Sequence, residues 1–156
     1  MKMNLQNGIP RFSRQRGIAI VEMVIALPVI LLLMLMVAEF GRVFYQYGTL
    51  NKAVRDGARY VAGTAIFGST GTVQLTSTVV NETKSLVTTG SVGGSASLLP
   101  GLTAADVTLT TAGPGNNRVT ATYTFQPIFD VLPGFGASGD RSLAFTLTAS
   151  NVMKVL

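Results

Sequence analysis

Acidic side chains are the main candidates for chemistry in this sequence, because it contains neither histidine nor cysteine. Histidine is the commonest general base and metal ligand, and cysteine supplies thiolate ligands and disulfides. Seven carboxylates remain: Glu22, Glu39, Asp56, Glu82, Asp106, Asp130 and Asp140. No two are spaced as an acid–base pair, and no serine-nucleophile or phosphate-binding glycine motif accompanies them. We therefore expect no enzyme activity, no cofactor and no metal site.

One of these carboxylates, Glu22, lies in an unusual place. It is the single charged residue in the apolar run from Ile18 to Ala38. A charged side chain near the bilayer centre costs about 2.5–3.5 kcal/mol on insertion scales, so an acid in such a run needs a reason. Either it lies hydrated at headgroup depth without a function, or it has a partner inside the membrane. Its spacing alone leaves both interpretations open.

The apolar run itself predicts a transmembrane helix, since about 20 apolar residues span a bilayer. A cleavable secretory signal has a shorter apolar region, of about 7–15 residues, followed by a small-x-small site. Here the best exit site, "MVAEF", places Met36 where a small residue is required. A buried core helix is the other alternative, but a soluble domain of this size would not easily bury a helix that is apolar on all sides. Pro28 removes one backbone donor and is expected to kink the span.

The helical pattern continues beyond the apolar run. A stripe with a period near 3.6 contains Phe40, Phe44, Tyr47, Leu50, Val54, Ala58 and Val61. The four aromatic residues between positions 40 and 47 would suit the interfacial region of a membrane. One helix from residue 18 to about residue 62 would be on the order of 65 Å long at about 1.5 Å per residue. We expect half of it in lipid and half outside.

A separate small domain follows, with one helix and three strands. Valines at seven-residue spacing predict a short helix over residues 72–89. Residues 106–112 and 118–126 predict two strands joined by the turn "GPGNN", and residues 141–152 predict a third strand. Period-2 alternation assigns one inner face to Val119, Ala121, Tyr123, Phe125, Leu143, Phe145, Leu147 and Ala149.

The predicted fold class is therefore α+β: a long N-terminal transmembrane helix, a second short helix and a small antiparallel sheet. Three parts are expected: a basic leader at residues 1–17, the spanning and projecting helix at 18–62, and an exported α+β domain at 63–156. A core of three strands on one helix is marginal in size when isolated.

The net charge of +5 is concentrated around the apolar run. Four basic residues and no acid lie in the first 17 residues, and a net charge of +3 follows between Arg42 and Arg59. The charges beyond residue 60 cancel. Because the exported domain has no basic stripe, nucleic acid is not an expected partner, whereas lipid headgroups would attract both flanks.

The leader, the glycine and the glutamate form a pattern when taken together. "RQRG" followed by "IAIVE" places Gly17 at the end of the basic leader and Glu22 at the fifth position after it. This resembles the type IV prepilin signal, which a membrane aspartic peptidase cleaves after the glycine. The resemblance implies a cut between Gly17 and Ile18, and a pairing of Glu22 with the freed amine of a neighbouring subunit. A paired charge in lipid costs much less than an isolated one.

A longer series of motifs resembles the TadE-like family, small membrane-anchored pseudopilins of the Flp pilus in tight-adherence systems. The matching positions are Arg16-Gly17, Val21-Glu22, Ala26-Leu27-Pro28, Glu39-Phe40-Gly41-Arg42, and Ala53, Arg55, Gly57, Ala58 and Arg59 within "NKAVRDGARY". Met23 departs from the family, which usually has an aromatic residue after the glutamate. The chain also lacks the cysteines and the large extra domain of some relatives, so it resembles the short form.

This resemblance implies a non-catalytic component of pilus biogenesis and surface adhesion. Its expected partners are membrane lipid, other pilin-like subunits, tight-adherence assembly proteins and the prepilin peptidase. The numbers of Lys and Arg on the two sides of the span are too similar to decide its orientation. The prepilin pattern implies an inner-membrane protein with a cytoplasmic N-terminus and a periplasmic or extracellular C-terminal domain. The alternative is an unprocessed bitopic anchor whose exported domain scaffolds a secretion complex or binds a ligand.

Overall fold

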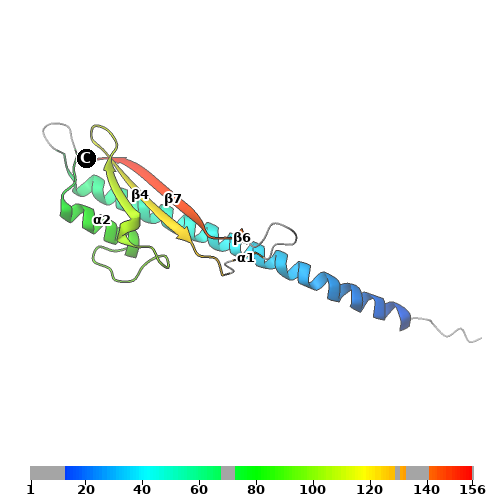
Figure 1. The fold of residues 1–156 in the computed structure, drawn as a ribbon. Coiled ribbons are helices and arrows are strands. Elements are labelled where there is room, and N and C mark those ends of the chain that lie inside the picture. Colours follow the sequence, from blue (N-terminus) through cyan, green and yellow to red (C-terminus); the bar gives the residue numbers. More distant parts are fainter. Residues whose placement is uncertain (1–12, 68–72, 129–130, 133–140, 156) are drawn as a thin grey trace, which may run out of the picture. The chain divides into compact units, whose positions relative to one another are not determined.

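The structure is a computed structural model that describes residues 13–67, 73–128, 131–132 and 141–155. Its elements follow the predicted order: a long helix, a short helix and an antiparallel sheet (Figure 1). The predicted α+β class is confirmed. The chain divides into two compact units, Met1–Phe40 and Gly41–Leu156, and each is described separately below.

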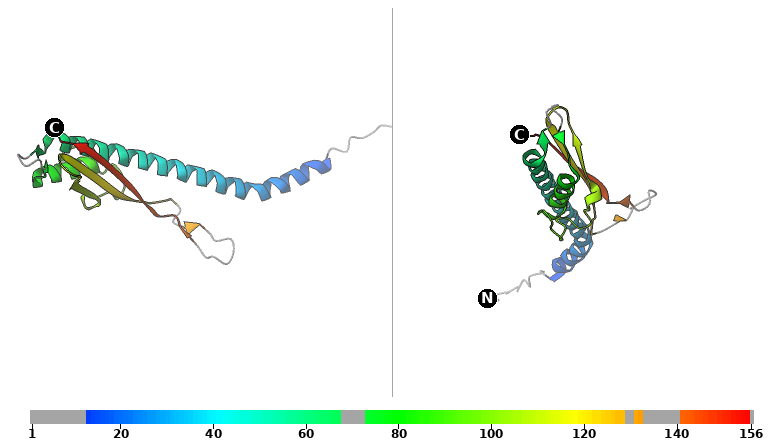
Figure 2. Two further views of the ribbon diagram at one scale, coloured as in Figure 1. Left: turned by 90° about the horizontal axis from the view of Figure 1, so that it is seen from above. Right: turned by 90° about the vertical axis from the view of Figure 1, so that its left-hand side faces the viewer.

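Helix α1, Ser13–Thr64, provides the first unit and enters the second. It begins before the predicted residue 18 and ends two residues after the predicted residue 62. Pro28 lies inside it, and Figure 2 shows the helix bending within its blue N-terminal part. A proline there removes one backbone hydrogen bond and clashes with the preceding turn.

The apolar half of α1 is exposed on every side. All side chains from Ile18 to Met34 are exposed, and both Ile18 and Val37 keep 71% of their surface accessible. The most apolar window of the helix has a mean hydropathy of 2.9, and it is long enough to cross a bilayer. A helix that is apolar all round requires lipid or protein around it.

The second half of α1 buries one face in the core of the second unit. Predicted stripe residues Leu50, Val54, Ala58 and Val61 are all at most 1% exposed. The first part of the predicted stripe is different, because Phe40 and Phe44 are 64% and 72% exposed. The buried face begins at Gln46 and recurs every three or four residues, as expected for one side of a helix.

Helix α2, Ser77–Thr89, begins later than predicted. Val73–Gln74 is strand β2, paired with strand β1, Ile66–Phe67, so the first residues of the predicted helix belong to a hairpin. The Thr76 hydroxyl then accepts a hydrogen bond from the Val79 amide and caps the helix. Gly90, at φ 80°, ends it in the left-handed conformation that glycine adopts without strain.

The sheet has the order β3-β4-β7, and both pairings are antiparallel. Its strands are β3, Val107–Thr111; β4, Asn116–Phe125; and β7, Phe145–Lys154. The 3-10 helix η1, Ala104–Asp106, precedes β3, and strands β5, Val131–Leu132, and β6, Arg141–Ser142, form a separate pair. The predicted third strand therefore comprises β6 and β7. Most of the predicted connection 127–140 lies outside the described residues.

The predicted inner face of the sheet has the correct alternation, but its residues are not all buried. Val119, Tyr123 and Phe125 are at most 2% exposed. Phe145 pairs with Phe125 in the ladder but keeps 45% of its surface exposed. It lies at the first position of an edge strand, where fewer neighbours cover it. Leu143 precedes β7 and lies outside the sheet.

Candidate functional site

The predicted processing residues lie on one exposed face of α1. Gly17, Ile18, Val21, Glu22 and Ile25 line a shallow depression along this face. Their spacing of three to four residues brings them onto one side of the helix. Glu22 is the only ionisable group among them, and it is exposed. A membrane-embedded partner could therefore reach its carboxylate directly.

Gly17 is open on all sides. A Cβ built at this position would meet nothing within 4 Å. It is the fifth residue of α1, which begins at Ser13, so it lies in the second turn. The predicted basic leader falls mostly on residues 1–12, which lie outside the described residues.

Motif residue Arg42 joins α1 to the sheet. Its guanidinium donates a 3.3 Å hydrogen bond to the Gln126 carbonyl, and its central carbon lies 5.6 Å from the centroid of the Phe125 ring. The Phe125 ring in turn packs against Phe145, with centroids 5.4 Å apart. A guanidinium over an aromatic ring is attracted by the negative face of the ring. Arg42 thus fixes one end of the sheet to the start of the buried helix face.

At motif residue Gly57, helix α1 lies close to both α2 and β4. A Cβ built there would lie 2.5 Å from Cγ2 of Val87, 3.3 Å from Cγ2 of Thr83 and 3.7 Å from Cγ1 of Val119. Val87 and Thr83 belong to α2, whereas Val119 belongs to β4. Any larger side chain would push α2 away from α1, so glycine is required for this packing.

The neighbouring motif residues divide between the core and the solvent. Ala58 is fully buried, and its carbonyl accepts a 3.4 Å hydrogen bond from Nδ2 of Asn117. Arg55 and Arg59 are exposed. Glu39 is partly buried, whereas Phe40 and Gly41 are exposed. The motif therefore combines packing positions on one side of α1 with charged positions on the other.

Two tyrosine contacts were not predicted from the sequence. The Tyr60 hydroxyl donates a 2.6 Å hydrogen bond to Glu82 on α2. The Tyr123 hydroxyl donates a 3.2 Å hydrogen bond to the Pro100 carbonyl, and burial raises the pKa of this phenol while the Arg42 charge partly opposes the rise. Period-2 alternation indicated that Tyr123 points inward, but nothing in the sequence indicates its acceptor.

The hydrogen bonds of Tyr60 and Tyr123 tie α1 to α2 and β4 to the segment before β3. Within the part of the chain that the structure describes, acidic side chains do not gather in groups of three that could hold a metal ion. Two features are candidates for a functional role: the apolar run of α1 from Ile18 to Ala38, with Glu22 as its single acid, and the α+β domain that follows it.

The fold and this site define a class of protein: an α+β head that follows a candidate membrane span, consistent with a single-pass membrane protein. Residues 17–59 match the family described as TadE-like protein. The resemblance inferred from the motifs is confirmed over this segment, which contains Glu22, Arg42 and Gly57. The family points to the tight-adherence pilus system, whose TadE-like components are generally non-catalytic. No curated protein and no solved structure matches the chain.

Proposed function

We propose that the chain is a pseudopilin-like, non-catalytic subunit of a tight-adherence pilus, processed between Gly17 and Ile18. One observation carries this proposal: a single exposed carboxylate, Glu22, follows Gly17 by five residues in the otherwise apolar run of α1 from Ile18 to Ala38. The TadE-like match begins at the same glycine. A subunit of this kind acts in pilus biogenesis and, through the filament, in surface adhesion.

The position of Gly17 in the helix favours proteolysis. A protease binds its substrate in an extended form, so the second turn of α1 must open before cleavage. Glycine stabilises a helix by about 1 kcal/mol less than alanine. Opening of the helix at Gly17 therefore costs less than it would at an alanine, and a Cβ built at Gly17 would meet nothing within 4 Å among the described residues.

Cleavage would also explain the acid. It would create a positively charged amine at Ile18, close to the apolar boundary, and Glu22 would supply a negative partner in the same region. A charge pair avoids the large cost of an isolated ion in lipid. We propose that the pair forms between adjacent subunits, so that each mature subunit recruits the next.

The same mechanism sets the location and the partners. The leader would face the prepilin peptidase on the cytoplasmic side of the inner membrane, and the head would lie in the periplasm or outside the cell. Lipid surrounds the apolar helix before assembly, and other pilin-like subunits and tight-adherence assembly proteins replace it afterwards.

Two variants separate processing from assembly. Gly17→Phe should leave the full-length chain uncleaved in membranes that contain the prepilin peptidase. Glu22→Ala should be cleaved like the wild type but should fail to co-purify with pilin-like subunits, and Met23→Ala is its neighbouring control. Normal co-purification of Glu22→Ala would contradict the pairing. Normal pilus assembly by an uncleaved chain would instead support the unprocessed anchor.

A further inference from the structure

Strand β7 has an open edge along its whole length. It pairs with β4 through all ten of its residues, from Phe145 to Lys154, in an unbroken register. Within the described ranges no strand pairs with its other side. In an antiparallel ladder alternate residues direct their N–H and C=O groups to each side, so half of these groups face the open edge.

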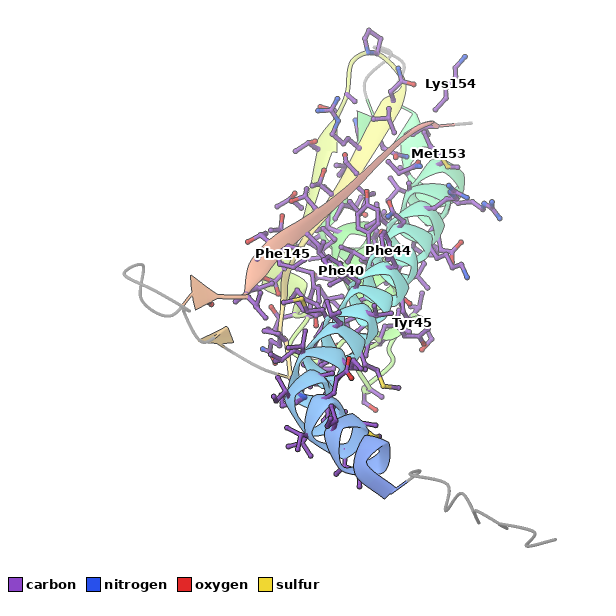
Figure 3. All side chains as sticks on the ribbon, turned by 90° about the vertical axis from the view of Figure 1, so that its right-hand side faces the viewer. Phe40, Phe44, Tyr45, Phe145, Met153 and Lys154 are labelled. Atoms are coloured by element: carbon purple, nitrogen blue, oxygen red, sulfur yellow. The ribbon has the colours of Figure 1, made fainter. Side chains whose placement is uncertain are left out.

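This edge lacks the features that usually prevent strand pairing. β7 contains no proline, its ladder has no bulge, and its only charge is Lys154 at the end. Edge strands are normally short or protected by prolines, bulges or inward charges. β7 is about twice the usual strand length of 5–6 residues, and Phe145 and Val152 are 45% and 47% exposed. Figure 3 shows Phe145 at one end of the strand, with Met153 and Lys154 at the other.

The opposite side of the sheet offers a matching strand. β3, Val107–Thr111, is the other edge of the three-stranded sheet and also has no described partner on its outer side. Both β3 and β7 are antiparallel to β4, so they run parallel to each other. Each molecule therefore carries two complementary edges with the same direction.

The direction of β7 relative to the buried part of α1 can be derived from two contacts. Arg42 contacts Phe125, which pairs with Phe145. Sixteen residues later in α1, Ala58 contacts Asn117, which pairs with Met153. β7 thus runs in the same direction as the buried part of α1. Two copies paired through antiparallel β7 edges would have the buried parts of α1 running in opposite directions, whereas pairing of β7 with β3 keeps them parallel.

The sheet faces exclude a parallel pair of β7 edges as well. Two parallel β7 strands would be related by a two-fold axis along the strands. This axis would turn the partner's sheet over, so that the apolar face of one sheet, which faces the helices and is called the helix-ward face, would lie beside the threonine-rich outer face of the other. Pairing with β3 keeps the helix-ward faces together, because Val107 and Leu109 lie on the same face as Leu147.

We propose that β7 pairs in parallel with β3 of a second copy of this chain, so that neighbouring subunits share a continuous sheet. The contact is head-to-tail, because each copy pairs with one neighbour through its β7 edge and with the other neighbour through its β3 edge. A heterologous contact of this kind continues from copy to copy and does not stop at a dimer. It rests on the proposed function only in requiring that all copies are inserted in the same direction.

Disulfide cross-linking can test this pairing cleanly, because the chain has no cysteine. Thr108 and Ser150 both pair with Thr120, so they lie at the same level on the two edges. Inside one molecule they are two strand spacings apart, about 10 Å. That separation is too long for a disulfide, which needs Cα atoms within about 7 Å. A bond between cysteines at 108 and 150 must therefore join two copies.

The experiment uses the full-length chain in membranes together with its assembly proteins. The double variant Thr108→Cys/Ser150→Cys is oxidised and separated on a non-reducing gel, and cysteines at 146, 148 and 152 replace the one at 150 to allow for an axial shift. We expect a ladder of dimers, trimers and larger species at one of these positions. Each single variant should remain monomeric, as should the control pair Thr108→Cys/Lys52→Cys on the solvent face of α1.

Three results would overturn the proposal. The first is a monomer at all four positions although the cysteines react with a maleimide. The second is a dimer from Ser150→Cys alone, which would indicate pairing between two β7 strands. The third is cross-linking to a different protein only. None of these results depends on cleavage after Gly17, so this proposal and the proposed function can fail separately.

Discussion

Replacement of Gly57 by alanine tests the packing of α1, α2 and β4. The added methyl would lie 2.5 Å from Cγ2 of Val87, about 1 Å or more inside the normal contact distance of 3.5–4.0 Å between carbon atoms. Val87 is fully buried and β-branched, so it has little freedom to move away. Overpacking of this kind costs about 1–3 kcal/mol. The better helix propensity of alanine returns up to about 1 kcal/mol.

Gly48 provides a matched control on the same helix, because a Cβ there meets nothing within 4 Å. Gly48→Ala should therefore stabilise the protein by up to about 1 kcal/mol through propensity alone. Gly57→Ala should be less stable than Gly48→Ala by about 1–3 kcal/mol, the overpacking cost. At roughly 4 °C per kcal/mol, the melting temperatures should differ by about 4–12 °C.

The assay is thermal unfolding of the detergent-solubilised full-length chain, followed by the near-ultraviolet signal of its tyrosines. The chain has no tryptophan. Tyr45, Tyr47 and Tyr60 lie on α1, whereas Tyr123 lies in the core on β4 at 2% exposure, so loss of the Tyr123 signal reports on unfolding of the sheet. Equal stabilisation by the two substitutions would refute the close approach of α2 to α1 at Gly57.

Three further predictions concern the head. Arg42→Met should destabilise it by about 1–2 kcal/mol through loss of the ring contact and the carbonyl hydrogen bond, whereas the exposed Arg55→Met should have no measurable effect in the same melts. Phe125→Ala should cost about 3–5 kcal/mol, at least twice the loss for the half-exposed Phe145→Ala in chemical denaturation; equal losses would contradict the burial of Phe125. Burial raises the pKa of Tyr123, so its contribution is complete below the unfolded value of about 10 and is lost as pH rises through the folded pKa. Melting temperatures measured from pH 9 to 11.5 should therefore fall less for Tyr123→Phe than for the wild type, and parallel curves would contradict this assignment.

Much of the fold could be predicted from the sequence because its patterns are long and regular. The apolar run and the 3.6-residue period after it predicted α1 to within a few residues of its ends. Alternation over residues 118–126 predicted the inner face of β4, and the glycines of "GPGNN" predicted the hairpin that precedes it. In the structure Gly113 and Gly115 have positive φ values of 98° and 69°, which glycine adopts at no steric cost.

Other features depend on contacts between distant segments and left no local signal. The start of α2 was placed too early because Val73 fits a helical spacing equally well, although it pairs with β1. Phe145 carries the inward alternation of a core residue, but its exposure depends on its place at the sheet edge. The motif indicated that Gly57 and Arg42 matter, yet their roles depend on the positions of α2 and Phe125.

The intact mass of the membrane-extracted chain decides whether it is processed as a pseudopilin. The protein is produced in two otherwise identical strains, with and without the prepilin peptidase, and its N-terminus is identified by mass spectrometry. We predict a chain that begins at Ile18 when the peptidase is present and a chain that retains residues 1–17 when it is absent. A chain that still carries residues 1–17 in the presence of the active peptidase would contradict processing and leave an unprocessed membrane anchor.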